Sequence, residues 1–342
     1  MRWYPVELHT HTCHSDGSFT VEALVDAAAR NGYRALALTD HNTSSGVPRM
    51  AALAPQKGIL PVRGLEWTTY HGHMVVLEEN GYTDWRGVKP EEIDEAIRSI
   101  HRNGGIVGIA HPFSLSDPIN TGYHWAFQIK DWSLPDYMEV WTRNYAPRRL
   151  QSVRAFEMWE KLLSEGHRIT AMTGRDWHKD DGLPCCYTWV GCEGELTVPK
   201  LLDAIRGGHI CVSAGPLLTM EAEIPGETGS GKEAISCGET FPAATEELTL
   251  HLNLQEEILP GVWDRTQVKS GEIRVIADGK VTACVPAEKT CTLQPRTLQT
   301  CTLRVKTPEK WLRADLFGSY YGLEDCRIAL TNPVFRDGEP AL

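Results

Sequence analysis

Up to about residue 215, short apolar runs alternate with segments of helical periodicity, and this alternation is the strongest constraint on the fold. The first helical pattern spans 21–29, follows two possible capping residues, Ser18 and Thr20, and ends at Asn31-Gly32. A buried strand is expected next, at 34–39. Strands separated by helices pair in parallel, because the helix returns the chain to the same edge of the sheet. The pattern therefore predicts a parallel sheet, closed into a barrel.

The same alternation continues along this part of the chain. Helices are expected at 90–103, 147–165 and 198–206, and strands at 6–8, before the first helix, and at 59–65, 106–110, 137–141, 169–173 and 187–190. Glu91 and Glu92 stand in the first turn of the first of these helices, where negative charge favours the helix dipole. The predicted fold class is α/β.

After residue 215 the pattern changes to alternating strands, expected at 248–254, 272–277, 301–306, 311–317 and 327–330. Asp278-Gly279 is a strong hairpin signal. Residues 225–232 are linker-like or a long hairpin loop, and they lack the full pattern of a phosphate-binding loop. We predict a barrel domain over 1–215 and a small antiparallel β-sandwich domain over 216–342.

Composition limits the partners and the location. The formal net charge is −11, so an extended phosphate backbone is a poor partner and we expect no nucleic acid. No run of about 18 apolar residues occurs, so we expect no membrane span, and no signal peptide is recognisable. Ten cysteines without a repeated C-x-x-C pair indicate free thiols in a reducing cytoplasm. The oligomeric state stays open.

Polar residues follow the predicted strands at the point where each strand ends. In a barrel these ends meet at one face, where sites are built. His9-x-His11 places two imidazoles on the same side of an extended segment, and Asp176-x-His178 repeats this arrangement. Mixed His and carboxylate sets suit zinc, manganese or iron better than calcium. The residues at these ends are His9, His11, Asp40, His41, Glu66, His111, Asp176 and His178. They predict a site for two or three divalent ions.

Four motifs in this order resemble the PHP (polymerase and histidinol phosphatase) family. They are His9–Gly17, Leu38–Asn42, Ala110–Pro112 and Gly174–His178. Within the family the chain is most similar to the stand-alone branch that includes the carbamate-hydrolase-like CehA/McbA proteins, through Glu66, Gly72-His73 and Glu139-Val140-Trp141. The resemblance implies a distorted barrel of seven strands and helices.

The resemblance also implies a ligand set. It assigns His9, His11, Glu66 and Asp176 to one ion, Glu66, His73 and His111 to a second, and Asp16, His41 and His178 to a third. Glu66 would bridge the first two ions. His71 is a local alternative to His73, which the Gly-His pair favours.

Other residues have less definite roles. Arg175 could contact a phosphate or carboxylate, or form a surface salt bridge, and Asp40 could fix an imidazole tautomer. Glu139 is a ligand or orients one, with the second role favoured. His14 could approach the cluster or line its entrance, and Arg143 and Lys179 are candidates for substrate binding. Asp40 and Arg175 are the two candidate catalytic side chains.

The expected reaction is hydrolysis of a small-molecule phosphate ester by a metal-bound hydroxide. Paired ions about 3.5–4 Å apart can clamp the attacking and leaving oxygens of such a displacement. The same metals could instead cleave a carbamate, amide or ester, as the CehA/McbA resemblance suggests. A non-catalytic metal-binding scaffold is the third possibility, and the near-complete ligand set argues against it.

Overall fold

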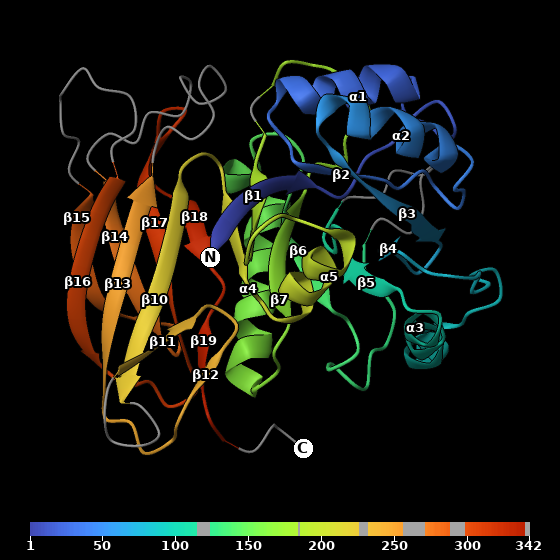
Figure 1. The fold of residues 1–342 in the computed structure, drawn as a ribbon. Coiled ribbons are helices and arrows are strands. Elements are labelled where there is room, and N and C mark those ends of the chain that lie inside the picture. The colour runs from blue at the N-terminus through green and yellow to red at the C-terminus, as the bar shows by residue number, and fades with distance from the viewer. Residues whose placement is uncertain (115–123, 184, 226–231, 256–270, 288–297, 339–342) are drawn as a thin grey trace.

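The computed structural model describes residues 1–114, 124–183, 185–225, 232–255, 271–287 and 298–338. Within these residues the helices lie in the first two thirds of the chain, close to the predicted positions, with α2 as an addition (Figure 1). Thr20 caps the first helix through a hydrogen bond from Ala23 N, and Gly166 ends the longest one in the left-handed region. The α-helices are α1 (Val21–Arg30), α2 (Val47–Leu53), α3 (Ile93–Arg102), α4 (Leu150–Glu165) and α5 (Val198–Arg206). Short 3-10 helices are η1 (Ala54–Lys57), η2 (Pro90–Glu92) and η3 (Ala146–Arg148).

The first nine strands form one mixed sheet in the order β9-β8-β1-β2-β3-β4-β5-β6-β7. β1 to β3 pair in parallel, as do β5 to β7. The predicted strands are all present, with β4 and β9 in addition. Their bounds are β1 (Arg2–Glu7), β2 (Ala35–Leu38), β3 (Leu60–Thr69), β4 (Gly72–Leu77), β5 (Ile106–Ile109), β6 (Tyr137–Thr142), β7 (Thr170–Gly174), β8 (Tyr187–Cys192) and β9 (Ile210–Ser213).

The sheet is not the regular alternation of seven strands and helices that was predicted. β3 and β4 form a hairpin in which Thr69 opposes Gly72, so no helix separates them and their pairing is antiparallel. β4 and β5 are also antiparallel, as are β1 and β8. β7 and β8 meet through side-chain bonds, in which Thr173 N donates to Thr188 Oγ1 (3.0 Å) and Thr188 Oγ1 donates to Thr173 O (3.1 Å). The fold is α/β and richer in strands than expected.

The last part of the chain consists of strands in two layers, drawn yellow to red in Figure 1. One layer is the sheet β11-β10-β13-β16, and the other contains β12, β14, β15, β17, β18 and β19. β10 lies against β17 and β18, which gives the sandwich arrangement. The bounds are β10 (Leu217–Pro225), β11 (Lys232–Ser236), β12 (Thr240–Phe241), β13 (Glu247–Gln255), β14 (Gly271–Ala277), β15 (Lys280–Ala287), β16 (Leu298–Lys306), β17 (Trp311–Tyr320), β18 (Leu323–Thr331) and β19 (Val334–Arg336).

Two hairpin predictions fall in this part. Asp278 (φ 49°) and Gly279 (φ 78°) connect the antiparallel strands β14 and β15, so that hairpin is confirmed. β10 and β11 also pair antiparallel, whereas residues 226–231 between them lie outside the described residues. The second layer continues the first sheet, because Ala329 of β18 pairs with Ser213 of β9. The domain boundary at 215/216 stays a prediction.

A buried charged network connects the two parts of the chain. Arg313 of β17 is fully buried and donates to Asp315 Oδ1 (2.9 Å) and to Glu160 Oε1 of α4 (2.7 Å). Asp315 also accepts from Arg327 Nε (2.8 Å). The guanidinium of Arg313 lies 4.9 Å from the ring centre of Trp311. Charges enclosed in this way must stay paired, so the network ties β17 to α4.

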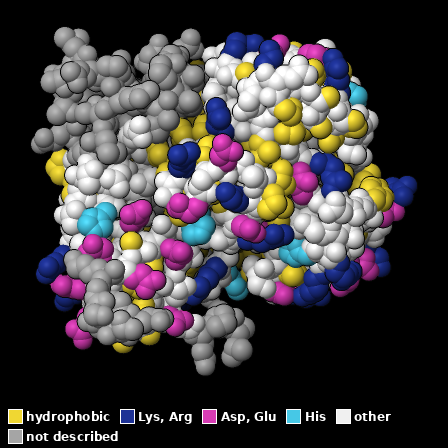
Figure 2. All heavy atoms as spheres, viewed as in Figure 1, with side chains coloured by type: hydrophobic (Ala, Val, Ile, Leu, Met, Phe, Trp, Pro, Cys, Tyr) yellow, Lys and Arg dark blue, Asp and Glu magenta, His cyan; other side chains and the backbone are white. Residues whose placement is uncertain are grey.

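The surface carries charges of both signs. On the face seen in Figure 2, Lys and Arg side chains are interspersed with Asp and Glu over the described residues. No helix in the described part of the chain is long and apolar enough to cross a membrane. The cysteines that the structure describes are all free thiols, six of the nine of them buried.

Candidate metal centre

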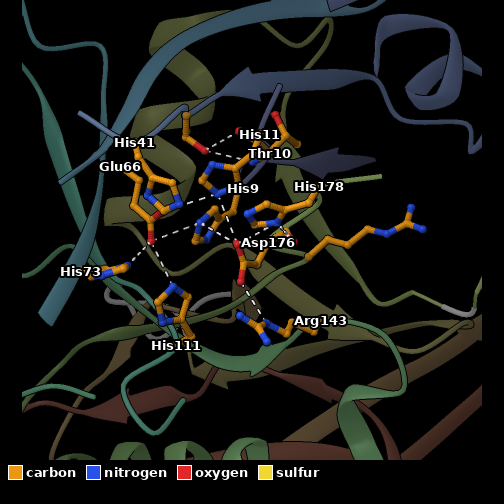
Figure 3. Close-up of polar contacts among 12 residues, drawn as sticks. His9, Thr10, His11, His41, Glu66, His73, His111, Arg143, Asp176 and His178 are labelled. Atoms are coloured by element: carbon orange, nitrogen blue, oxygen red, sulfur yellow. Dashed lines mark hydrogen bonds and ion pairs between the residues drawn. The ribbon is translucent and has the colours of Figure 1, made fainter. Parts of the chain in front are cut away.

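The predicted ligands converge because the backbone continues its parallel pairing beyond the strand ends. Thr39 N donates to Thr10 O (3.0 Å), and His11 N donates to Trp177 O (2.9 Å). A further parallel bridge joins His41 to Glu66. The ends of β1, β2 and β7, together with the middle of β3, therefore lie side by side. Figure 3 shows the side chains from these segments pointing toward one another.

Glu66 stands at the centre of the cluster. Its carboxylate is fully buried, and Oε1 lies 3.0 Å from both His73 Nδ1 and His111 Nε2. Oε2 lies 2.9 Å from His41 Nδ1 and 3.4 Å from His11 Nε2. One carboxylate thus contacts imidazoles from several segments of the chain, which is the arrangement that a bridging ligand requires.

Glu139 of β6 orients the first histidine. His9 Nδ1 donates to Glu139 Oε1 (2.7 Å), while Glu139 Oε2 accepts from His111 N (2.9 Å). A carboxylate on Nδ1 fixes the tautomer and leaves Nε2 as the ligand atom. Glu139 therefore supports two candidate ligands, and this contact agrees with the role favoured for it above.

A second group of ligand atoms faces solvent. Asp16 Oδ1 lies 3.2 Å from His178 Nε2 and 3.4 Å from His41 Nε2. The Asp16 side chain is 51% exposed, in contrast to the buried Glu66. His178 Nδ1 donates to Asp176 O (2.8 Å), which leaves its Nε2 directed at Asp16. This group lies at the entrance of the cluster.

All nine candidate ligands belong to groups that could hold a metal ion. Within each group the ligand atoms lie within 4.8 Å of one another. Ligands about 2.1 Å from a shared ion would be about 3.4 Å apart, so the observed spacing fits metal coordination. The groups are His11, Asp16, His41 and His178; His9, His111 and Asp176; His9, His11 and Glu66; and His41, Glu66 and His73.

Buried polar atoms provide an independent test of this fit. His9 Nε2 and His11 Nδ1 are buried and make no hydrogen bond among the described residues, since the carboxylate oxygens beside them, Glu66 Oε1 and Asp16 Oδ1, lie 3.4 and 3.9 Å away. Burying polar atoms without partners costs free energy, and such atoms usually have a partner. Imidazole nitrogens and a carboxylate oxygen are donors that suit zinc, manganese or iron. The residues present therefore fit a divalent metal centre.

The pKa shifts within the cluster also fit a metal centre. Burial acts to raise the pKa of Glu66, but the imidazoles around it hold that pKa well below its usual value. Burial lowers the pKa of His41, but hydrogen bonds to Asp16 and Glu66 outweigh it and raise that pKa to about 10. The carboxylates are thus charged, and they need positive charge from protons or metal ions.

We expect metal affinity to rise with pH for this reason. Without metal, the raised pKa keeps His41 protonated at neutral pH, so an ion that binds its nitrogen must displace a proton. Each displaced proton gives about a tenfold increase in affinity per pH unit. Titration of metal-free protein with Zn²⁺ at pH 6, 7 and 8 measures this slope. An affinity that does not change with pH would contradict the protonation of His41.

The backbone is strained at several of these residues. His111 (φ 27°), Asp176 (φ 50°) and Arg143 (φ 62°) have positive φ, which is uncommon for residues other than glycine. Such conformations cost about 1–3 kcal/mol each and cluster at functional sites. At Asp176 the turn directs the carboxylate into the cluster, where Oδ1 lies 3.2 Å from His11 Nε2. No local sequence pattern indicated this strain.

The remaining candidates lie in different places. Arg143 is next to the cluster and donates from Nε to Asp176 Oδ2 (2.9 Å), with its side chain 42% exposed. His73 contacts Glu66, whereas His71 lies against Tyr70 and Phe127. His14 Nδ1 pairs with Ser45 Oγ (2.7 Å), and Lys179 is exposed beside the site.

The two candidate catalytic residues contact other parts of the chain. Arg175 pairs with a carboxylate, one of the alternatives given above, but at a buried position: its guanidinium lies 3.8 Å from the ring centre of Trp177 and Nη2 lies 3.4 Å from Asp181 Oδ1. The carboxylate of Asp40 accepts from Thr12 and Ser15 and fixes no imidazole. Both side chains follow a strand, but packing turns them away from the cluster.

Sequence reasoning missed Glu7, which lies beneath the cluster. Glu7 Oε1 accepts from His9 N (3.1 Å) and Arg175 N (3.2 Å), and burial raises the pKa of Glu7 to about 7. Its carboxylate therefore holds the backbone of two motif segments together. The available signal was a charged residue inside an apolar strand, two positions before His9.

Comparisons with known proteins agree with this geometry. Residues 7–132 match the family model described as PHP domain. Over this region the chain is similar to PHP domains. The match ends before Asp176 and His178, which the structure brings to the same cluster.

Three curated relatives each match a short stretch of the chain. An error-prone DNA polymerase of Symbiobacterium thermophilum is 41% identical over 78 residues, which are 22% of this chain and 7% of the polymerase. A phosphoribosyl 1,2-cyclic phosphate 1,2-diphosphodiesterase of Eggerthella lenta is 38% identical over 64 residues (19% and 24%). A 3′,5′-nucleoside bisphosphate phosphatase of Chromobacterium violaceum is 37% identical over 76 residues (21% and 27%). The chain thus spans about a quarter or less of these relatives.

One solved structure matches almost the whole chain. It is described as a two-domain protein of Bacteroides vulgatus that contains a predicted PHP-like metal-dependent phosphoesterase. The TM-score is 0.52 at 15% identity, and the match covers 97% of this chain and 95% of that protein. At this identity the comparison shows a shared fold. The fold of the mixed sheet together with the strands that follow it therefore occurs in another protein.

Proposed function

We propose that this chain is a metal-dependent hydrolase that cleaves a phosphate ester of a small molecule. The observation that carries the proposal is the cluster around Glu66, where nine His, Asp and Glu side chains form four groups of metal-ligand geometry. The PHP domain match supports it, as do the phosphodiesterase and phosphatase among the relatives. We infer two or three ions of zinc, manganese or iron.

The residues of the cluster have different roles in holding and orienting the metal ligands. Bound divalent ions lower the pKa of water and neutralise the oxygens of a phosphate. Glu66 and Asp176 hold the imidazoles of separate strands at one place, and Glu139 keeps His9 in the tautomer that presents Nε2. Because the donors are fixed before substrate arrives, little reorganisation is needed during the reaction.

Arg143 is the side chain best placed to bind the phosphate. It is anchored to Asp176 at the edge of the cluster (Figure 3), and its side chain is 42% exposed. A guanidinium forms paired hydrogen bonds with phosphate oxygens. Arg143 would thus add positive charge at the entrance of a site whose other charged side chains are carboxylates and imidazoles. Lys179 stays a second candidate for substrate binding.

The test compares two bond types under defined metal loading. Purified protein is stripped with chelator and reloaded with Mn²⁺ or Zn²⁺, then assayed on p-nitrophenyl phosphate, bis-p-nitrophenyl phosphate, p-nitrophenyl acetate and an aryl carbamate. We expect release from a phosphate ester that disappears with chelator and returns with metal. Turnover of the acetate or carbamate alone would replace this proposal with a carbonyl hydrolase. Fewer than two retained ions per chain would favour a scaffold.

A further inference from the structure

The solvent-facing group depends on one ligand that comes from a turn. His11, His41 and His178 follow β1, β2 and β7 closely, whereas Asp16 lies in the turn formed by residues 12–17. Within this turn Thr12 O accepts from Ser15 N and Gly17 N, both at 3.0 Å. Asp16 can reach the imidazoles only while this turn keeps its shape.

Asp40 holds the turn from below. Its carboxylate is buried, and Oδ1 accepts from Thr12 N (2.7 Å) and Ser15 Oγ (2.6 Å). Oδ2 accepts from Thr12 Oγ1 (2.7 Å). Hydrogen bonds to a charged acceptor are about twice as strong as neutral ones. Asp40 therefore fixes the residue at the start of the turn and the one next to Asp16.

The turn has little room to adopt another shape. A Cβ atom on Gly17 would lie 2.5 Å from the carbonyl carbon and oxygen of His11, so the chain passes directly over that residue. The next residue, Ser18, donates from its backbone N to His178 O (2.7 Å). The turn is thus connected at one end to Asp40 and at the other to the segment of a second ligand.

We propose that Asp40 is a positioning residue that controls occupancy of the solvent-facing metal site through Asp16. This inference rests on the proposed metal centre. The buried groups share His11 and His41 with the solvent-facing group, but none of them includes Asp16 or another residue of the turn, and Glu66, which two of them contain, is fully buried. Loss of Asp40 should therefore weaken one class of bound metal and leave the others in place.

The experiment counts metal ions and does not depend on activity. Metal-free wild type and Asp40→Ala are titrated with Zn²⁺ by calorimetry, and retained zinc is measured after gel filtration. We expect one class of sites to weaken about 10- to 100-fold in Asp40→Ala, as is typical when a residue that orients a metal ligand is lost. Asp26→Ala, which removes an exposed carboxylate paired with Lys57, is the matched control and should bind like wild type.

Two further variants show how Asp40 acts. Ser15→Ala removes one of the three bonds to Asp40, together with a longer contact to Asp16 Oδ1 (3.5 Å), and should weaken the same class to a smaller extent. This variant also tests the proposal if Asp40→Ala does not fold. Asp16→Asn should weaken that class too, and Asp40→Ala should add nothing to it, because the two residues act in series. Equal weakening of all classes, additive effects, or unchanged binding in Asp40→Ala and Ser15→Ala would overturn the proposal. Wild type that binds metal but cleaves no phosphate ester would contradict only the proposed function.

Discussion

Replacing Glu66 by glutamine is expected to lower phosphoesterase activity by about 10³-fold, because shared metal ligands stabilise the transition state by several kcal/mol. The amide keeps the size of the side chain but lacks the negative charge that faces His41, His73 and His111. It also places an N–H group where an imidazole N–H needs a hydrogen-bond acceptor or a metal ion needs an oxygen lone pair. The measurement is the rate of p-nitrophenol release from the preferred phosphate ester, with metal content determined on the same sample.

The control for this substitution is Glu95→Gln on α3. Glu95 is exposed and pairs with Arg102 at the surface, so activity and metal content should match wild type. Glu66→Gln protein that retains both full activity and full metal content would remove Glu66 from the centre of the site. Circular dichroism establishes that both variants are folded.

The second large effect concerns stability. Arg313→Met is expected to lower the free energy of unfolding by about 3 kcal/mol, because the buried carboxylate of Asp315 loses one of its two guanidinium partners and keeps only Arg327. Methionine fills much of the space beside Trp311, but Asp315 and Glu160 lose the guanidinium that contacts both. Urea unfolding followed by tryptophan fluorescence gives the change.

An exposed pair on the same sheet provides the comparison. Asp325→Asn breaks the contact between Asp325 and Arg274, but Asp325 is 69% exposed, so the expected loss is under about 1 kcal/mol. If Arg313→Met lowers the free energy of unfolding by as little as this, the buried network contributes little to stability. A loss for Asp325→Asn as large as that of Arg313→Met would mean that burial does not decide the difference.

Local patterns were sufficient for most elements of the fold. Helical spacing identified α1, α3, α4 and α5, and the apolar runs identified the strands of the mixed sheet apart from β4 and β9. The direction of pairing was harder to predict, because the Thr69–Gly72 hairpin is short and lacks the Asn-Gly or Asp-Gly pair that marks such turns. Without that hairpin, a parallel barrel was the natural expectation.

The candidate site, like the fold, could be predicted from the sequence only in part. Motif residues at strand ends were identifiable because strand ends converge whatever the details of packing. The residues that contact these motif residues could not be identified from the sequence. His9 and Glu139, for example, are 130 positions apart and meet only through the arrangement of β1 and β6. Arg175 and Asp40 followed strands as the ligands do, yet packing against Trp177 and Thr12 took them away from the cluster.

The sequence by itself indicated most of the elements and their order, because these depend on periodicity, and it indicated the nine candidate metal ligands through positions near strand ends together with the resemblance to the PHP family. Only the tertiary structure decided which side chains face one another: Glu66 at the centre, Glu139 behind His9, Asp40 under the turn of Asp16, and Arg313 between β17 and α4. Such contacts join residues far apart in the chain, and they depend on how the strands pair and pack, which no local pattern specifies.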